Sequence, residues 1–127
     1  MITSDTICAQ ATAQGGAISV IRVSGQNAIE ITSRIFSKDI TKAKGYTLHY
    51  GHITDPQLEG ANIIDDVLVS VFRSPHSYTG EDSTEISCHG SRFIVQKILE
   101  ALIFSGARLA TPGEFTKRAF IAGKMDL

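Results

Sequence analysis

Two stretches of the sequence show strand periodicity: residues 84–89 have one apolar and one polar face, and in residues 18–23 Ile18, Val20 and Arg22 alternate with Ser19, Ile21 and Val23. A period of two is typical of a β-strand with one face against a core and the other face free. Each stretch is followed by a segment, 27–36 or 93–104, in which apolar residues recur at helical spacing. Strands and helices therefore follow one another along the chain, which predicts an α+β domain, a mixed β-sheet with helices packed against it.

The remaining elements follow from the same two periods and from turn residues. Residues 67–72 form a strongly apolar stretch, so we expect a strand covered on both faces. The helix at 93–104 is apolar over most of its circumference, so it is expected to be well buried and to end at Gly106. Ser24 is expected to cap helix 27–36. Further strands are predicted at residues 6–12, 47–54 and 108–110, with a last helix from a capping box at Thr111–Glu114 to Ala122.

The composition limits what the domain can do. With 127 residues the chain fits one domain, which we expect to span residues 1–127. A formal net charge of −1 and a sequence pI of about 6.4 are unlike the strongly basic character of a dedicated nucleic-acid binder. No apolar run is long enough to cross a bilayer, and the N-terminus does not read as a signal peptide. Two cysteines make no disulfide framework, so a cytoplasmic protein with reduced thiols is expected.

The polar face of one strand holds the first candidate for a site. Glu85, Ser87 and His89 share a face of strand 84–89, where they line either a pocket or a solvated sheet surface. A carboxylate accepts two parallel hydrogen bonds well, which suits a ligand edge with adjacent N–H groups, such as that of a pterin or guanine. Glu85 is therefore the candidate anchor for such a ligand.

Two cations and one loop are further candidates. Arg22 lies on a strand near a glycine turn, and it either binds a ligand or extends its charge to water. Lys124 follows the last helix, where it faces either the negative end of the helix dipole or an anionic group of a ligand. The loop at residues 74–82 is long and polar, and its Tyr78 either stacks on a flat ring or covers the edge of the core.

Metal binding and cysteine catalysis are disfavoured. Cys88 and His89 form a single Cys-His pair, whereas a zinc site needs about three or four ligands at characteristic spacing. Cys88 alternates with polar residues and is expected to face the core with Thr84 and Ile86, where a thiol is inert. The sequence also lacks the Gly-x-x-x-x-Gly-Lys-Ser/Thr phosphate loop of nucleotide hydrolases.

Three stretches, in this order and spacing, resemble the N-terminal domain of the MnmE/TrmE family of tRNA-modification GTPases. The first runs from Asp5-Thr6-Ile7 to Ile21-Arg22-Val23-Ser24-Gly25, the second from Ser77-Tyr78-Thr79-Gly80-Glu81-Asp82 through Glu85 to Cys88-His89-Gly90, and the third from Pro112-Gly113-Glu114-Phe115-Thr116-Lys117-Arg118-Ala119-Phe120 to Gly123-Lys124-Met125-Asp126-Leu127. The resemblance covers essentially the whole chain. One loop departs from the family pattern, because Thr12–Gly16 is one residue shorter and lacks the usual Pro-Pro pair and Arg.

The resemblance implies a fold similar to the folate-binding domain of aminomethyltransferase, and it implies that 5-formyltetrahydrofolate or 5,10-methylenetetrahydrofolate binds here. By the family's motifs, the folate contacts fall on Arg22, Glu85 and Lys124. The resemblance also implies homodimerisation, and in longer members a GTPase domain that uses GTP, Mg and K. With the flavin-dependent partner MnmG/GidA, such members modify carbon 5 of the wobble uridine in tRNA.

Two other functions fit the same residues. The chain could be a purely structural dimerisation domain with a vestigial pocket, or a free-standing folate enzyme similar to aminomethyltransferase. The Gly123–Leu127 motif favours the GTPase family over the free-standing enzyme.

Overall fold

The computed structural model describes residues 5–124, which form nine elements in the order that the sequence predicts. These are β1 (Ile7–Gln10), β2 (Ile18–Ser24), α1 (Ala28–Ile35), β3 (Thr47–Thr54), β4 (Ile63–Phe72), β5 (Ser83–His89), α2 (Arg92–Phe104), β6 (Arg108–Leu109) and α3 (Glu114–Ile121). Three residues of the motif at 123–127 lie outside the described residues.

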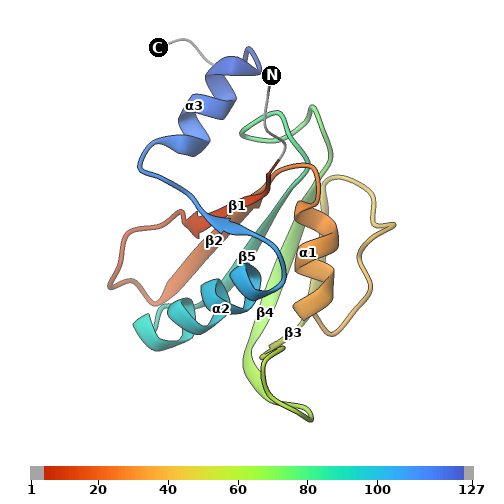
Figure 1. Cartoon of the computed structure of the whole chain (residues 1–127), viewed down its shortest axis with the longest axis vertical. Coiled ribbons are helices and arrows are strands. Elements are labelled where there is room, and N and C mark those ends of the chain that lie inside the picture. The colour runs from red at the N-terminus through yellow and green to blue at the C-terminus, as the bar shows by residue number, and fades with distance from the viewer. Residues whose placement is uncertain (1–4, 125–127) are drawn as a thin grey trace.

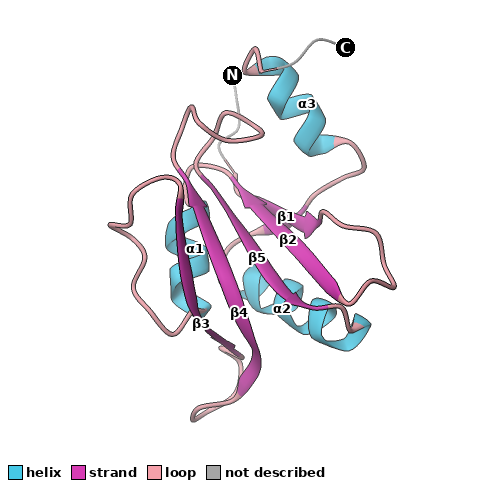
Figure 2. Ribbon diagram, turned by 180° about the vertical axis from the view of Figure 1, so that it is seen from behind, coloured by secondary structure: helices cyan, strands magenta, loops and turns pink. Residues whose placement is uncertain are grey.

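The six strands form one sheet in the order β3-β4-β5-β2-β1-β6. The short β6 pairs parallel with β1, while the other neighbours pair antiparallel, so the sheet is mixed. Helices α1 and α2 contact each other on one face of the sheet (Figure 1), and the view from behind shows the strands on the opposite, open face (Figure 2). The predicted α+β class, with helices packed against a mixed sheet, is confirmed.

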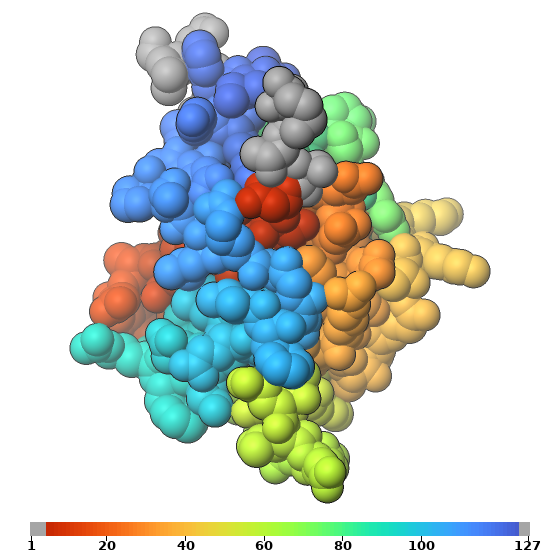
Figure 3. Space-filling model, viewed as in Figure 1, coloured from red at the N-terminus to blue at the C-terminus, as the bar shows by residue number. Residues whose placement is uncertain are grey.

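The core lies between the sheet and the two helices. The alternation of β5 places Ile86 opposite Ile21 of β2 and Val69 of β4, and all three side chains are fully buried. Seen from the helix side, the space-filling view shows α1 and α2 covering this layer, with the β3–β4 connection protruding beyond it (Figure 3). Removal of these branched apolar side chains from water is the main force that holds the sheet to the helices.

Strand β4 differs from the prediction in length and in burial. It begins at Ile63, four residues before the predicted start, and it is covered on one face. Val67, Val69 and Val71 are buried against the helices, whereas Leu68 on the open face is 40% exposed. The expectation that both faces are covered is therefore wrong for the part of the chain that the structure describes, because its helices α1 and α2 occupy the same side.

The helix ends also correct the sequence interpretation. Ser24 is the last residue of β2, and Asn27 precedes α1 without a side-chain capping bond. At the start of α3, the Glu114 carboxylate accepts the Thr111 N–H as in a capping box, but left-handed Gly113 stands at the cap and Pro112 precedes the helix. Helix α2 is less buried than expected, because one side of it exposes Phe93, Ile103 and Phe104.

Burial of Cys88 predicts a slow thiol. The side chain is 3% exposed on the core face of β5. Its burial, and to a smaller extent the nearby charge of Asp65, raises the pKa of the thiol to about 11. Cys8 is fully buried, and burial raises its pKa to about 12. Because the thiolate is the nucleophile, we expect both thiols to react slowly with a maleimide at neutral pH until denaturant is added. Rapid and complete labelling of the folded chain would contradict the assignment of the faces.

Candidate functional site

The open face of the sheet holds a cavity of about 410 Å³ near the ends of β2, β4 and β5. It is lined by Arg22, Tyr46, Phe72, His76, Ser77, Tyr78, Ser83, Glu85 and Lys124. The three residues singled out from the sequence, Arg22, Glu85 and Lys124, thus lie in one place although they come from distant parts of the chain. Their role in binding stays a prediction.

The strand register explains why Arg22 and Glu85 meet. The two residues are directly opposite each other in the antiparallel ladder of β2 and β5. Opposite residues project to the same face, and successive residues of a strand project to opposite faces. The neighbouring Thr84 accordingly points the other way, with its hydroxyl 2.7 Å from that of Thr32 in α1. Arg22 and Glu85 therefore both face the cavity rather than the core.

Arg22 is held in the cavity by a carboxylate and two aromatic rings. Its Nε donates to Glu85 Oε2 at 3.0 Å, and the two side chains are 20% and 28% exposed. The guanidinium carbon lies 4.5 Å from the centre of the Tyr78 ring and 5.4 Å from that of Phe115 in α3. Cation–π contact and the ion pair thus turn Arg22 inward, so it does not simply extend to water.

The cavity loop, residues 73–82, is fixed by its own polar side chains. Thr79 is fully buried, and its hydroxyl lies 2.6 Å from that of Ser24 at the end of β2. Ser77 Oγ donates to the Glu81 carbonyl at 2.5 Å, and the Asp82 carboxylate accepts the Ser74 N–H at 2.8 Å. These bonds give the loop a defined path, and that path places Tyr78 over Arg22.

Lys124 reaches the cavity because α3 ends in a glycine turn. Gly123 has φ +77, and its N–H bonds to the Phe120 carbonyl at 3.0 Å. The Lys124 N–H bonds to the Ala119 carbonyl at 2.8 Å, which completes a Schellman motif. The helix ends at Ile121 with Ala122 as its cap, close to the predicted end at Ala122, and this stop directs Lys124 toward the cavity.

Sequence reasoning missed an aromatic wall of the cavity. Tyr46 packs edge-on against Phe72 with ring centroids 6.2 Å apart. The His76 ring is tilted relative to that of Tyr46, and the centroids of these two rings are also 6.2 Å apart. Tyr46 precedes β3 with φ 62, a left-handed conformation that is uncommon for a large residue. Because the three rings come from separate segments, no local pattern in the sequence could have linked them.

Ser87 and His89 do not line the cavity, although the sequence placed them on the same strand face as Glu85. His89 lies at the far end of β5, where its ring Nδ1 is 2.8 Å from Asp65 Oδ1. Its side chain is 71% exposed. The candidate pocket wall is therefore confined to the Glu85 end of the strand.

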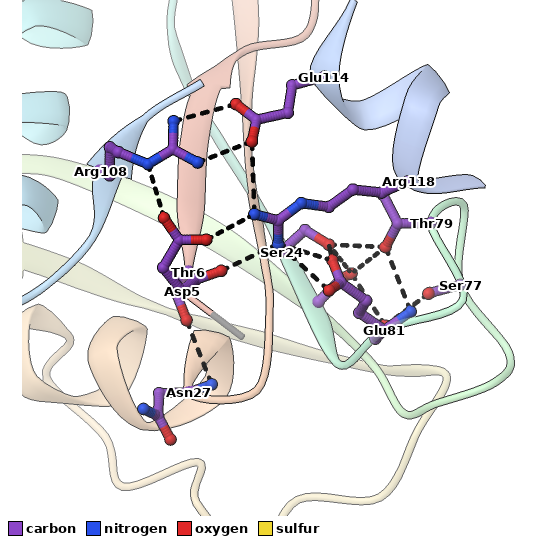
Figure 4. A network of polar contacts seen from close by, with 11 residues as sticks. Asp5, Thr6, Ser24, Asn27, Ser77, Thr79, Glu81, Arg108, Glu114 and Arg118 are labelled. Carbon is purple, nitrogen blue, oxygen red and sulfur yellow. Dashed lines mark hydrogen bonds and ion pairs between the residues drawn. The ribbon is translucent and has the colours of Figure 1, made fainter. Parts of the chain in front are cut away.

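The first turn of α3 is tied to the sheet by an ion pair (Figure 4). Arg108 of β6 donates through Nη2 to Glu114 Oε2 at 2.7 Å and through Nε to Asp5 Oδ2 at 2.7 Å. The Thr111 N–H donates to Glu114 Oε1 at 2.9 Å. The hydrogen bond from Arg108 and those from Thr111 lower the pKa of Glu114 to about 2, against partial desolvation that raises it.

This lowered pKa predicts an acid-labile contact. A carboxyl with a folded pKa below its unfolded value contributes stability above the unfolded pKa, and the contribution is lost as the pH falls through the folded pKa. We therefore expect Glu114→Gln to destabilise the chain near neutral pH, with a difference from the parent that shrinks as the pH falls from 4.5 toward about 2. Urea unfolding across this range measures it, and a difference independent of pH would contradict the assignment.

Among residues 5–124 no group of three or more His, Cys, Asp or Glu side chains could hold a metal ion. No helix in this range is long and apolar enough to cross a membrane.

Comparison with known proteins gives one consistent result. A family model described as the N-terminus of the GTP-binding protein TrmE matches residues 6–124. The tRNA modification GTPase MnmE of Bacteroides thetaiotaomicron is 59% identical over 131 residues, which cover 99% of this chain and 27% of that protein. The proteins of the same name from Flavobacterium psychrophilum and Thermoanaerobacter pseudethanolicus are 55% and 54% identical, with 100% and 97% of this chain covered. The chain spans 27% to 28% of the length of these three relatives.

Proposed function

The chain belongs to the family of the TrmE N-terminus, and we propose that it serves a tRNA-modification GTPase as the domain that binds a one-carbon tetrahydrofolate. The ligand would be 5-formyltetrahydrofolate or 5,10-methylenetetrahydrofolate. The observation that carries the proposal is the cavity that brings together Arg22, Glu85 and Lys124 from β2, β5 and the end of α3.

Glu85 supplies the group that recognises the pterin. A reduced pterin carries a ring N–H and an amino group side by side on one edge, and one carboxylate accepts from both. Arg22 already donates to Oε2 of Glu85 in the ligand-free chain. Binding in this manner requires Arg22 to shift or to share that oxygen. Before the ligand arrives, the hydrogen bond from Arg22 holds the carboxylate in its orientation.

The other walls of the cavity suit the rest of the ligand. The rings of Tyr46, Phe72 and Tyr78 offer flat apolar surface to the conjugated parts of a folate. Lys124 and the freed guanidinium of Arg22 offer positive charge to the formyl oxygen or to the anionic glutamate tail. A cavity with aromatic walls and a few convergent charges is the usual form of a small-molecule site.

In a longer protein the bound folate would donate the carbon for an aminomethyl or carboxymethylaminomethyl group at C5 of the wobble uridine of tRNA. GTP, with Mg and K, would be bound by a separate GTPase domain, because this chain has no phosphate loop. The flavin-dependent protein MnmG/GidA would be the partner, and we place the assembly in the cytoplasm. These proposals extend the family membership and the names of the relatives.

We also propose that the chain pairs with a second copy of itself. The open face of the sheet exposes Leu48 at 63%, Tyr50 at 60% and Leu68 at 40%. Contiguous exposed apolar side chains of this size often mark an interaction surface. A purely structural dimerisation domain would pair in this way without binding a ligand. Equilibrium dialysis with 5-formyltetrahydrofolate separates the two functions, because the proposed function requires binding.

A further inference from the structure

Helix α3 brings two groups to the cavity, yet little apolar burial holds it in place. Phe115 in its first turn lies against Arg22, and Lys124 follows its last turn. Among the eight residues of α3, all of them described, Ala119 is the single buried side chain. One alanine removes little apolar surface from water, so polar contacts must decide where α3 sits.

Arg118 makes several of these polar contacts (Figure 4). Its Nη1 donates to the Asp5 carbonyl at 2.9 Å and to both oxygens of Glu81 at 3.2 Å. Its Nη2 donates to Asp5 Oδ1 at 2.8 Å and to Glu114 Oε2 at 3.4 Å. The side chain is 12% exposed, and it does not line the cavity. The planar fork of an arginine thus connects α3 with Asp5, two residues before β1, and with the cavity loop at the same time.

The cavity loop is also in close contact with the rest of α3. The Tyr78 hydroxyl lies 3.2 Å from that of Thr116, two residues before Arg118 in α3. At Gly80, with φ +84, an added Cβ would lie 2.7 Å from the Cβ of Ala122. Glu81 is held from its other side by Ser24 Oγ at 2.8 Å. The loop is therefore a fixed surface against which α3 is aligned.

We propose that Arg118 is a positioning residue for the cavity, which fixes α3 against the cavity loop so that Lys124 faces the ligand and Phe115 stays against Arg22. The inference rests on the proposed folate binding, but it also predicts the behaviour of α3 without ligand. Arg118 contacts Glu81 of the loop and Asp5 near β1. Outside α3, Glu81 is also held by Ser24 and Asp5 by Arg108. Its loss should free the helix while the sheet and its core stay folded.

The test uses Arg118→Met, which keeps a long apolar side chain and removes the fork. We expect it to weaken the binding of 5-formyltetrahydrofolate by about 10-fold, because groups of one polar network are energetically coupled. The effect should act through Lys124, so Arg118→Met should cost much less affinity in a Lys124→Met background than in the parent. A general loss of stability would lower affinity equally in both backgrounds.

Arg108→Met is the matched control. Arg108 shares Asp5 and Glu114 with Arg118, but its hydrogen bonds do not reach Glu81. The substitution therefore removes the same charge as Arg118→Met. We expect this variant to bind the folate within about twofold of the parent, because the link between α3 and the cavity loop is kept.

Hydrogen exchange of the free chain gives a second readout. In Arg118→Met the amides of Lys117 in α3 and of Ala122, its C-cap, should exchange about 10-fold faster, while the amides of β5 keep their protection. Unchanged exchange in α3, or independent effects of Arg118 and Lys124 on affinity, would overturn the inference. If the parent binds no folate, the proposed function fails, and the exchange of α3 alone decides whether Arg118 positions the helix.

Discussion

Glu85→Gln is expected to weaken binding of 5-formyltetrahydrofolate by about 10- to 100-fold, because hydrogen bonds to a charged group contribute about 1.5–3 kcal/mol each. The substitution keeps the size of the side chain and replaces one acceptor oxygen with a donor. A pterin edge presents two donors, so one of them would then face another donor. Isothermal titration of the parent and the variant measures the difference.

The stability of the ligand-free chain should change little in this variant. The Arg22–Glu85 pair is partly exposed, at 20% and 28%, and exposed ion pairs contribute about 0–1 kcal/mol. Glu59→Gln is the matched control, since it makes the same chemical change on an exposed loop between β3 and β4. If folded Glu85→Gln binds the folate as tightly as the Glu59→Gln control, Glu85 is not the anchor of the pterin.

Ile86→Ala, one residue along the same strand, should have the opposite profile. Ile86 is fully buried on the core face, between Ile21 and Val69 in the sheet. Truncation of a buried isoleucine to alanine costs about 2–5 kcal/mol, because the transfer free energy is lost and a cavity remains. Because the free energy of unfolding of a domain is about 5–15 kcal/mol, this loss is a large fraction of the total. The midpoint of urea unfolding should therefore shift to a much lower urea concentration.

Ile86→Val is the graded control for this position. Removal of one methylene group should cost about 0.5–1.5 kcal/mol, between the parent and the alanine variant. Below its unfolding transition, Ile86→Ala should still bind the folate, since its side chain lies on the helix side of the sheet. An alanine variant as stable as the parent would show that Ile86 does not lie in the core.

The order of the elements could be predicted because it depends on local periodicity. The alternation in β5 placed Cys88 and Ile86 on the core face and Glu85 on the other face, as the structure has them. The partners of each strand could not be predicted in this way, because pairing depends on contacts between distant segments. The apolar run of β4 was misjudged for the same reason, since nothing local shows that the described helices cover only one of its faces.

The candidate site was predictable in part. The polar face of β5 suggested Glu85, and the positions of Arg22 and Lys124 raised them as candidates. The family resemblance then joined the three as folate contacts. Neither source indicated Tyr46, Phe72 or the contacts of Arg118. These depend on how β4, the cavity loop and α3 approach one another in space, which sequence spacing does not encode.

Titration of the 127-residue chain with 5-formyltetrahydrofolate is the most direct test of the central claim, that the cavity on the open face of the sheet binds a reduced folate. The arrangement of Arg22, Glu85 and Lys124 predicts saturable binding of about one folate per chain, weakened in Glu85→Gln and unchanged in Glu59→Gln. A folded chain that shows no saturable binding, or one in which both variants bind like the parent, would contradict it.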